Sequence, residues 1–437
     1  MTTIRSTALS LLLALLPLGV RGQSGLAIEA AIRTAWAHNQ GLLAGDSTVV
    51  AARQDALSAR DARLPTLEMH ARVLRTDEPV AAFGLKLDQG KIAQSDFDPA
   101  RLNGPDAIYG AGVGASLTQV LYAGGRISAG LRAREAQAGA EEKTQERRRQ
   151  ELALAVVEAY FSVLVAEQGV RFADDQLAHA RETERFVGAR VREAQLPQAD
   201  AMRATAVRAQ AEAETAGALQ RRESARSELS LLMGEGLRDR GLSTSLAIAQ
   251  EPPAPAAPSR PDLEASRLRI EAARAAGRVA DAALLPQVFL TLGVDTMRSS
   301  FKQGNTWTLA AVGARWDLGL PALRESHAAK AREAAASASL QWQEQQASRE
   351  AGEARGTAAA AQSRIAAAQE AVAASQSARS LREARHRQGL APLTEVLDAE
   401  AGLAGARTLL LRSQLELRVA HAQLELSLGR PVEGVQP

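Results

Sequence analysis

The sequence predicts a mainly α-helical protein with a membrane β part, in which long paired helices accompany four strands per chain in an internal two-fold repeat. The first observation is the composition: 46% of the 437 residues are apolar, but only 3% are aromatic. Such aliphatic sequence favours long helices packed side by side over a thick globular core. The second observation is that no proline occurs from residue 127 to 196 or from 322 to 391, which predicts two helices of about 70 residues. The third is that one order of elements occurs twice.

The N-terminus has the pattern of a secretory signal peptide. Arg5 precedes an apolar run from Ala8 to Val20, and small or polar residues follow as far as Gly25. We therefore expect residues 1–22 to be removed and the mature chain to lie outside the cytoplasm. The chain has no cysteine, which excludes disulfides, thiolate metal sites and a lipid anchor on an N-terminal cysteine.

The repeat is marked by short matches that keep their order in both copies. The matches pair Leu64-Pro65 with Leu285-Pro286, Leu196 and Asp200 with Leu390 and Glu395, and residues 231–234 with 426–429. A proline-rich stretch separates the copies and is expected to act as a stiff linker. The predicted divisions are a first repeat over 23–234, a linker over 235–259, a second repeat over 260–429 and a tail over 430–437.

Each copy contains a helix, a strand, a loop, a second strand, a long helix and a return helix. The first helical segments are expected over residues 26–63 and 262–284, and each ends at a Leu-Pro step. Polar loops are expected over about 77–106 and 298–305, and second strands near 108–121 and 306–317. Breaks at Pro197 and at residues 389–392 then precede return helices of about 36 residues, which end at Gly234 and Gly429.

The predicted strands have the pattern of a transmembrane β-barrel. In the first strand Leu67, Met69, Ala71 and Val73 alternate with Glu68, His70 and Arg72, and aromatic residues gather near the strand ends, as in barrel segments. A soluble hairpin is the alternative, and one hairpin alone would favour it. Four strands have two open edges, which lipid does not tolerate, so a barrel built from them requires several chains.

Composition and motifs argue against an enzyme or a nucleic-acid binder. The net charge is only +2, the six histidines have no metal-ligand spacing, and no phosphate-binding loop of the Gly-Lys-Ser/Thr type occurs. The pattern Gly110-x-Gly112-x-Gly114 resembles a nucleotide fingerprint, but it lies inside a predicted strand, where small residues in a barrel wall fit better. We therefore expect no cofactor and no bound metal.

Four segments together resemble the TolC-type outer-membrane efflux proteins. They are Leu121-Tyr122-Ala123-Gly124-Gly125-Arg126, Val156-Val157-Glu158-Ala159-Tyr160-Phe161, Arg260-Pro261-Asp262-Leu263 and the turn from Gly389 to Ala399. The resemblance implies a homotrimer in which each chain lends four strands to a twelve-stranded barrel in outer-membrane lipid. It also implies an α-helical coiled-coil tunnel through the periplasm that is closed at its inner tip, with the linker in the equatorial region.

The function implied is a passive exit duct of a tripartite efflux or type I secretion system. Its partners would be a periplasmic adaptor protein and an inner-membrane pump, which supplies the energy. A periplasmic coiled-coil adaptor or scaffold is the alternative, although the two aromatic-rich hairpins would then lack a purpose.

The candidate sites lie at the two helix turns and at one strand end. Glu395 and Asp398 are three residues apart on one helix face and are predicted to form a periplasmic gate of stacked carboxylate rings, together with Asp200. Stabilisation of the helix N-terminus by these acids is the alternative. Leu196, Gly389 and Leu390 are predicted to dock the adaptor, or else to be ordinary turn residues, and Gly124 and Gly125 to form the strand-helix junction. In the first-copy turn we expect Gln195 to replace the usual glycine and the turn to be one residue shorter.

Overall fold

The computed structural model describes residues 25–237, 240–246, 260–300 and 303–436. The predicted signal peptide and most of the predicted linker lie outside these residues. The chain forms two compact units, each described by itself. The first unit comprises Met1–Asn39, Leu152–Pro253 and Ala359–Ala422, and the second comprises Gln40–Glu151, Ala254–Ala358 and Gln423–Pro437.

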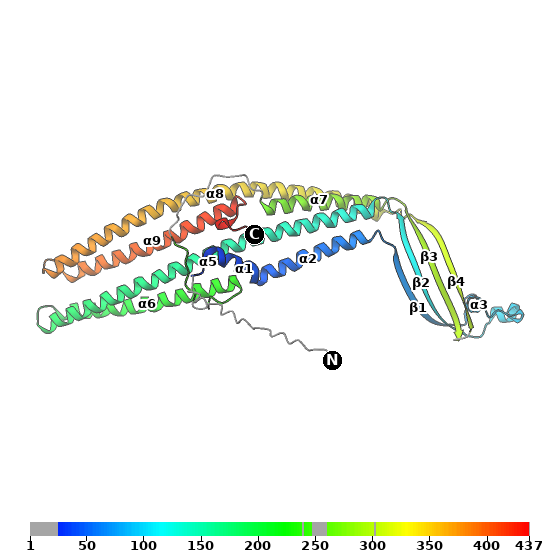
Figure 1. Ribbon diagram of the computed structural model, residues 1–437, viewed down its shortest axis with the longest axis horizontal. Helices are drawn as coiled ribbons and strands as arrows, with labels where there is room; N and C mark the ends of the chain where they lie inside the picture. Colours follow the sequence, from blue (N-terminus) through cyan, green and yellow to red (C-terminus); the bar gives the residue numbers. More distant parts are fainter. Residues whose placement is uncertain (1–24, 238–239, 247–259, 301–302, 437) are drawn as a thin grey trace, which may run out of the picture. The chain divides into compact units, whose positions relative to one another are not determined.

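The second unit contains a four-stranded antiparallel sheet with the strand order β1-β2-β3-β4. Its strands are β1 (Thr66–Thr76), β2 (Ile108–Tyr122), β3 (Gln287–Ser300) and β4 (Gln303–Arg315). The helices α2 (Gln40–Asp61) and α7 (Pro261–Ala282) lead into β1 and β3, and α5 (Arg126–Arg192) and α8 (Leu320–Arg387) follow β2 and β4 (Figure 1). These four helices therefore join the same end of the sheet, and the connections β1–β2 and β3–β4 lie at the opposite end, which we call the loop end.

The strand register sorts the side chains of the sheet onto two different faces. Leu67 lies opposite Leu117, which lies opposite Leu292, and Leu292 lies opposite Ala310. Because side chains alternate along a strand, this apolar face also carries Met69, Ala71, Val73, Val113, Ala115, Leu290, Val294 and Val312. The other, polar face carries Glu68, His70, Arg72, Ser116, Thr118, Thr291 and Asp295, with the glycines 110, 112, 114, 293 and 313. The alternation expected for the first strand is confirmed on β1. On β4 the two faces differ less, because Trp307 and Leu309 lie on the polar face and Thr306 and Thr308 on the apolar one.

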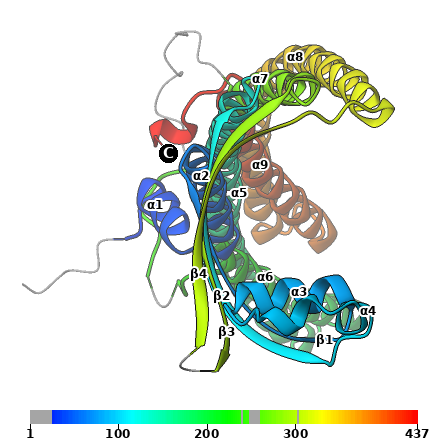
Figure 2. The same ribbon diagram turned by 90° about the vertical axis from the view of Figure 1, so that its right-hand side faces the viewer.

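The loop end differs from its prediction in both copies. Residues 77–107 contain three helical elements where a polar loop was expected: α3 (Pro79–Asp88), the 3-10 helix η1 (Gln94–Phe97) and α4 (Pro99–Asn103). In the second copy the strands continue through the expected loop, because Arg298 pairs with Gly304 and the ladder extends to Ser300 and Gln303. Figure 2 shows α3 on one side of the sheet, where it contacts β2, β3 and β4, with α4 beyond it.

The first unit is a helical assembly with a small aromatic core. It contains α1 (Ile28–His38), α6 (Gln198–Met233), most of α9 (Leu393–Ser427) and the adjoining parts of α5 and α8. Tyr160 and Phe161 are fully buried and meet edge to face with ring centroids 5.5 Å apart. The Tyr160 hydroxyl donates to the Leu26 carbonyl at 2.5 Å and accepts from the amides of Ser243 and Thr244 at 3.1 and 3.0 Å.

The long helices match the prediction, and the first helical segment does not. The helices α5 and α8 have 67 and 68 residues, and the return helices α6 and α9 have 36 and 35. By contrast, the single segment expected over 26–63 is broken at Asn39, whose backbone is extended and whose Nδ2 donates to the Leu232 carbonyl at 2.9 Å. Asn39 thus satisfies a carbonyl at the end of α6 and ends α1 there.

One stretch of α5 is apolar enough to resemble a membrane-spanning helix, with a mean hydropathy of 1.4 over 18 residues. Within this stretch 44% of the residues are buried inside the protein. The helix also contains the buried core residues Val156, Val157, Tyr160 and Phe161. Burial in the core therefore accounts for part of this apolar stretch.

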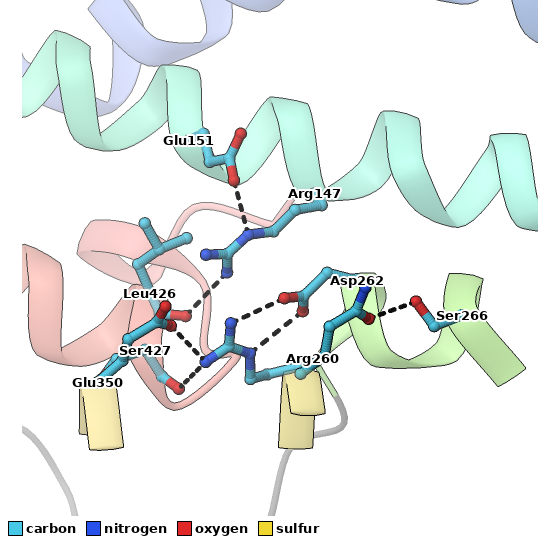
Figure 3. Close-up of polar contacts among 9 residues, drawn as sticks. Arg147, Glu151, Arg260, Asp262, Ser266, Glu350, Leu426 and Ser427 are labelled. Carbon is cyan, nitrogen blue, oxygen red and sulfur yellow. Dashed lines mark hydrogen bonds and ion pairs between the residues drawn. The ribbon is translucent and has the colours of Figure 1, made fainter. Parts of the chain in front are cut away.

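Two arginines hold the C-terminal end of α9 in the second unit (Figure 3). Arg147 donates to the Leu426 carbonyl at 3.1 Å and to Glu151 at 2.9 Å, and Arg260 donates to the Ser427 carbonyl at 3.5 Å. Arg260 also pairs with Asp262 at 2.7 Å and with Glu350 at 3.0 Å. Although burial opposes ionisation of Asp262, the hydrogen bond from Arg260 holds the pKa of that carboxyl below its ordinary value.

Candidate functional site

Two helix turns in the first unit carry the residues predicted for the gate and for adaptor docking. One turn links α5 to α6 and the other links α8 to α9. Ala194 has a φ of 57° and Gly389 a φ of 75°. The Ala194 amide donates to the Val191 carbonyl at 3.0 Å, and the Gly389 amide donates to the His386 carbonyl at 2.9 Å. Both residues therefore occupy the left-handed position that ends a helix.

This geometry corrects the expected alignment of the two turns. The Gln195 amide donates to the Arg190 carbonyl at 2.8 Å, as the Leu390 amide does to the Arg385 carbonyl at 2.9 Å. Gln195 therefore corresponds to Leu390, and Ala194 corresponds to Gly389. The turns are equally long, so the prediction of a shortened first turn was wrong. In the first turn the left-handed position is occupied by Ala194 and not by glycine. The two turns therefore could not be aligned on a shared glycine from the sequence.

The residues predicted to dock an adaptor lie in different environments. Leu390 is 64% exposed, and no atom lies within 4 Å of where a Cβ of Gly389 would stand. Leu196 is partly buried and packs against the cluster formed by Val187, Ala204 and Leu393. This cluster joins the two turns, so Leu196 has a packing role that Leu390 lacks.

The gate residues also differ in their surroundings. Glu395 lies in the first turn of α9 and forms an ion pair with Arg382 of α8. Asp398 is exposed, and in the described part of the chain it makes no hydrogen bond or ion pair. Asp200 is half-buried in the first turn of α6, where its amide donates to the Pro197 carbonyl at 3.1 Å. The structure thus joins Glu395 to an arginine and not to the other two acids.

Sequence reasoning missed a charged network next to this turn. Arg379 lies 3.9 Å from Glu400, 3.8 Å from Glu383 and 3.5 Å from the His179 ring. Burial raises the pKa of the Glu400 carboxyl, while the positive charge of Arg379 opposes that rise. Arg379 and Glu400 line a cavity of about 580 Å³ in this unit. The spacing of Arg379, Glu383 and Arg387 at four-residue intervals is the signal that could have revealed part of the network.

The strand-helix junction places both predicted glycines in left-handed conformations. Gly124 has a φ of 60° and Gly125 a φ of 82°. A Cβ on Gly124 would lie 2.7 Å from Cδ1 of Leu285, so this position needs glycine for space as well as for conformation. The junction is fixed further by Arg126, which donates to Oε1 of Gln287 at 3.1 Å.

The polar face of the sheet holds a side-chain hydrogen bond that spans three strands. His70 on β1 and Asp295 on β3 both lie opposite Gly114 of β2, and their side chains meet at 2.8 Å. A Cβ on Gly114 would lie 2.2 Å from the Asp295 carboxylate and 2.7 Å from the His70 ring. The glycine therefore leaves room for a contact across β2, which explains one glycine of the motif that resembles a nucleotide fingerprint. Among the described residues no cluster of three acidic or histidine side chains could hold a metal ion.

One family accounts for this combination of sheet, long helices and doubled order. The model of the outer membrane efflux protein family matches residues 31–235 and 254–430. The chain belongs to this family. The two matched segments agree with the two-fold repeat, and membership places the chain in the outer membrane as an efflux channel.

Solved structures share the fold at low sequence identity. The outer membrane protein VceC of Vibrio cholerae is 21% identical with a TM-score of 0.73, over 93% of this chain and 96% of that one. The open-state MtrE channel of Neisseria gonorrhoeae is 22% identical with a TM-score of 0.76, over 94% and 90%. The CmeC channel of Campylobacter jejuni is 15% identical with a TM-score of 0.80, over 94% and 86%. No curated protein sequence matches the chain.

Proposed function

We propose that three copies of this chain form the passive exit duct of a tripartite efflux or type I secretion system. The observation that carries the proposal is the four-stranded sheet, in which β1 and β4 each pair on one side only within the described residues. Its apolar face suits lipid and its polar face suits a water-filled lumen. Since open edges are not tolerated in lipid, β1 of one copy pairs with β4 of the next, and three copies close a twelve-stranded barrel.

The turns at Ala194 and Gly389 form the periplasmic tip in this proposal. Exposed Leu390 and Gly389 are the adaptor-docking surface, and Leu196 holds the two turns together from within. Asp398 supplies the uncompensated charge of the gate, Asp200 adds to it, and the Arg382–Glu395 pair keeps α8 and α9 together. An inner-membrane pump supplies the energy.

Membrane fractionation followed by sizing in detergent tests the assembly. The expected result is an outer-membrane protein with three times the mass of the mature chain. Recovery of a soluble monomer from the periplasm would support the adaptor or scaffold alternative and reject the duct.

Adaptor coupling is tested separately by crosslinking in cells. The chain has no cysteine, so a photoreactive or thiol-reactive group introduced at Leu390 reports on that position alone. We expect the group at Leu390 to crosslink to a periplasmic partner. The control position is Leu231, which is 71% exposed and lies in α6, far from the turn in sequence; a group there should not crosslink to that partner. Equal crosslinking at both positions would contradict docking at the tip.

A further inference from the structure

The helical segment at the loop end packs against the polar face of the sheet. We call residues 79–103 the cap segment. In it Ala82 and Leu85 are buried, and Gln89 donates from Nε2 to the Tyr109 carbonyl at 2.7 Å. Met297, which lies on the polar face of β3, is fully buried. The cap segment therefore lies on the lumen side of the wall, not on the lipid side.

Two glycines of β2 make this packing possible. A Cβ on Gly110 would lie 2.7 Å from Cδ1 of Leu85 and 3.0 Å from the Met297 sulfur. A Cβ on Gly112 would lie 2.9 Å from Cε of Met297. Side chains at these positions would occupy the space of Leu85 and Met297. The motif Gly110-x-Gly112 thus forms the seat of α3, just as Gly114 makes room for the His70–Asp295 pair.

The cap segment has its own internal contacts that hold it as a folded unit. Lys86 pairs with Asp96 at 2.9 Å, and the second oxygen of Asp96 accepts from the Ala93 amide at 2.9 Å. Phe83 and Phe97 meet edge to face with centroids 5.9 Å apart. A segment with a salt bridge, an aromatic pair and a seat in the wall is a structured element rather than a loose loop.

The size of the barrel determines what three such segments do. Twelve strands about 4.8 Å apart and tilted by about 40° enclose a backbone circle about 24 Å across. A helix with its side chains is about 10 Å thick, so three helices on the inner wall leave a gap of only a few ångströms at the axis. The loop end is the external end, because the helices at the other end extend into the periplasm.

We propose that the cap segments form a second size barrier at the external mouth of the duct, in addition to the gate at the periplasmic tip. The proposal rests on the proposed function, since it needs the trimeric barrel. The closed barrier admits water and small ions and excludes bulky solutes from outside. Bulky cargo leaves only when α3 leaves its seat on Gly110 and Gly112.

Thiol labelling tests the barrier without depending on the tip gate. Because the chain has no cysteine, Thr291→Cys places a single thiol on the polar face, on the periplasmic side of the seat along β3. Intact cells are treated with a small charged methanethiosulfonate or with a maleimide on a large polyethylene glycol. The small reagent is expected to label the Thr291→Cys protein and the large one is not.

Displacement of α3 should open the mouth to the large reagent. In the Thr291→Cys background, Leu85→Asp buries a charge against the wall, so α3 should leave its seat and labelling by the large reagent should rise about tenfold or more. Leu87→Asp is the matched control, because Leu87 is 51% exposed on the same helix. Gly110→Val should act like Leu85→Asp from the wall side, and Gly293→Val is its control, since a Cβ there meets nothing nearer than 3.7 Å.

The outcomes separate the barrier from the duct. Equal labelling by the large reagent in the Thr291→Cys protein and its Leu85→Asp and Gly110→Val derivatives overturns the barrier. If Leu85→Asp prevents trimer assembly, Gly110→Val decides alone. If the small reagent fails to label Thr291→Cys in the Leu85→Asp and Gly110→Val backgrounds as well, the polar face is not the lumen and the proposed duct itself is rejected.

Discussion

The Arg382 guanidinium on α8 forms an ion pair with the Glu395 carboxylate in the first turn of α9. The pair compensates one of the three charges that the sequence assigned to the gate, while exposed Asp398 keeps its charge uncompensated. The gate should therefore depend on Asp398 more than on Glu395.

Ion selectivity tests this division. A unit charge about 5 Å from an ion in water contributes on the order of 0.8 kcal/mol, or about fourfold in local ion concentration. Asp398→Asn should therefore lower the cation preference of single-channel current in planar bilayers. The double change Arg382→Gln, Glu395→Gln removes a neutral pair and should leave the preference unchanged.

The control for this test is Glu370→Gln, which removes an exposed charge of α8 away from the turn. It should not alter selectivity. An unchanged preference in Asp398→Asn would remove that residue from the gate and would favour stabilisation of the helix N-terminus, which is worth about 0.3–1 kcal/mol per acid.

The carboxyl of Glu425 should make stability depend on pH. Burial, with the nearby charge of Glu433, raises the pKa of Glu425 to about 7 from an ordinary value of 4.5. The folded protein thus holds a proton that the unfolded chain releases, and this contribution is complete below about pH 4.5 and is lost as pH rises through about 7. We expect the melting temperature of the purified protein, followed by helical circular dichroism, to fall between pH 5 and pH 8.

Glu425→Gln should remove that part of the pH dependence. The amide oxygen can still accept the bond from the Glu433 amide, which is 2.8 Å long, so the variant should be more stable than the parent at pH 8 by about 1–3 kcal/mol. Glu228→Gln, an exposed change on α6, is the control. An identical pH profile in the parent and Glu425→Gln would contradict this assignment.

Arg260 should be a more costly arginine to replace than the exposed arginines of the second unit. Its side chain is only 10% exposed and serves Asp262, Glu350 and the Ser427 carbonyl together. Arg260→Gln leaves both carboxylates unpaired and should destabilise by about 2–3 kcal/mol. The effect should appear as a lower midpoint of denaturant unfolding.

Arg267→Gln is the matched change, because the Arg267 side chain is 56% exposed and pairs with Glu344 alone. It should cost less than about 1 kcal/mol. Equal costs for the two arginines would mean that the cluster at the end of α9 adds nothing beyond ordinary surface pairs.

The matched turns predict opposite effects of glycine and alanine. Ala194→Gly should raise the free energy of unfolding by about 1 kcal/mol, since the left-handed conformation costs a residue with a Cβ about that much. Gly389→Ala should destabilise by a similar amount. The control is Ala199→Gly, inside the first turn of α6, which should destabilise the protein by about 0.5–1 kcal/mol. If Ala199→Gly also stabilised the protein, the effect at Ala194 would not come from its backbone conformation.

The sequence predicted those features that depend on local chemistry. Proline-free runs predicted α5 and α8, and the alternation from Leu67 to Val73 predicted which face of β1 is apolar. The break at Asn39 could not be predicted, because it depends on a carbonyl of Leu232, 193 residues away in the chain. The cap segment was missed because α3 is short and its apolar residues, Leu85 among them, are buried only where the helix packs against the sheet.

The candidate site shows the same division between local and distant information. The chemistry of Glu395 and Asp398 was visible in their spacing, but the pairing of Glu395 with Arg382 depends on how α8 and α9 lie together. The turn alignment failed at Ala194 because its φ is set by the surrounding hydrogen bonds and not by its residue type.

The Tyr160 hydroxyl implies an order of events during folding. Leu26 comes early in the chain, but its carbonyl accepts a hydrogen bond from the Tyr160 hydroxyl, which lies 134 residues later. That hydroxyl accepts from amides a further 83 and 84 residues along the chain. The α5–α6 hairpin is local in the chain, whereas the residues around Leu26 dock only once residues 243 and 244 are available. The segment around Leu26 is thus among the last to reach its place, although it precedes both of its partners in the chain.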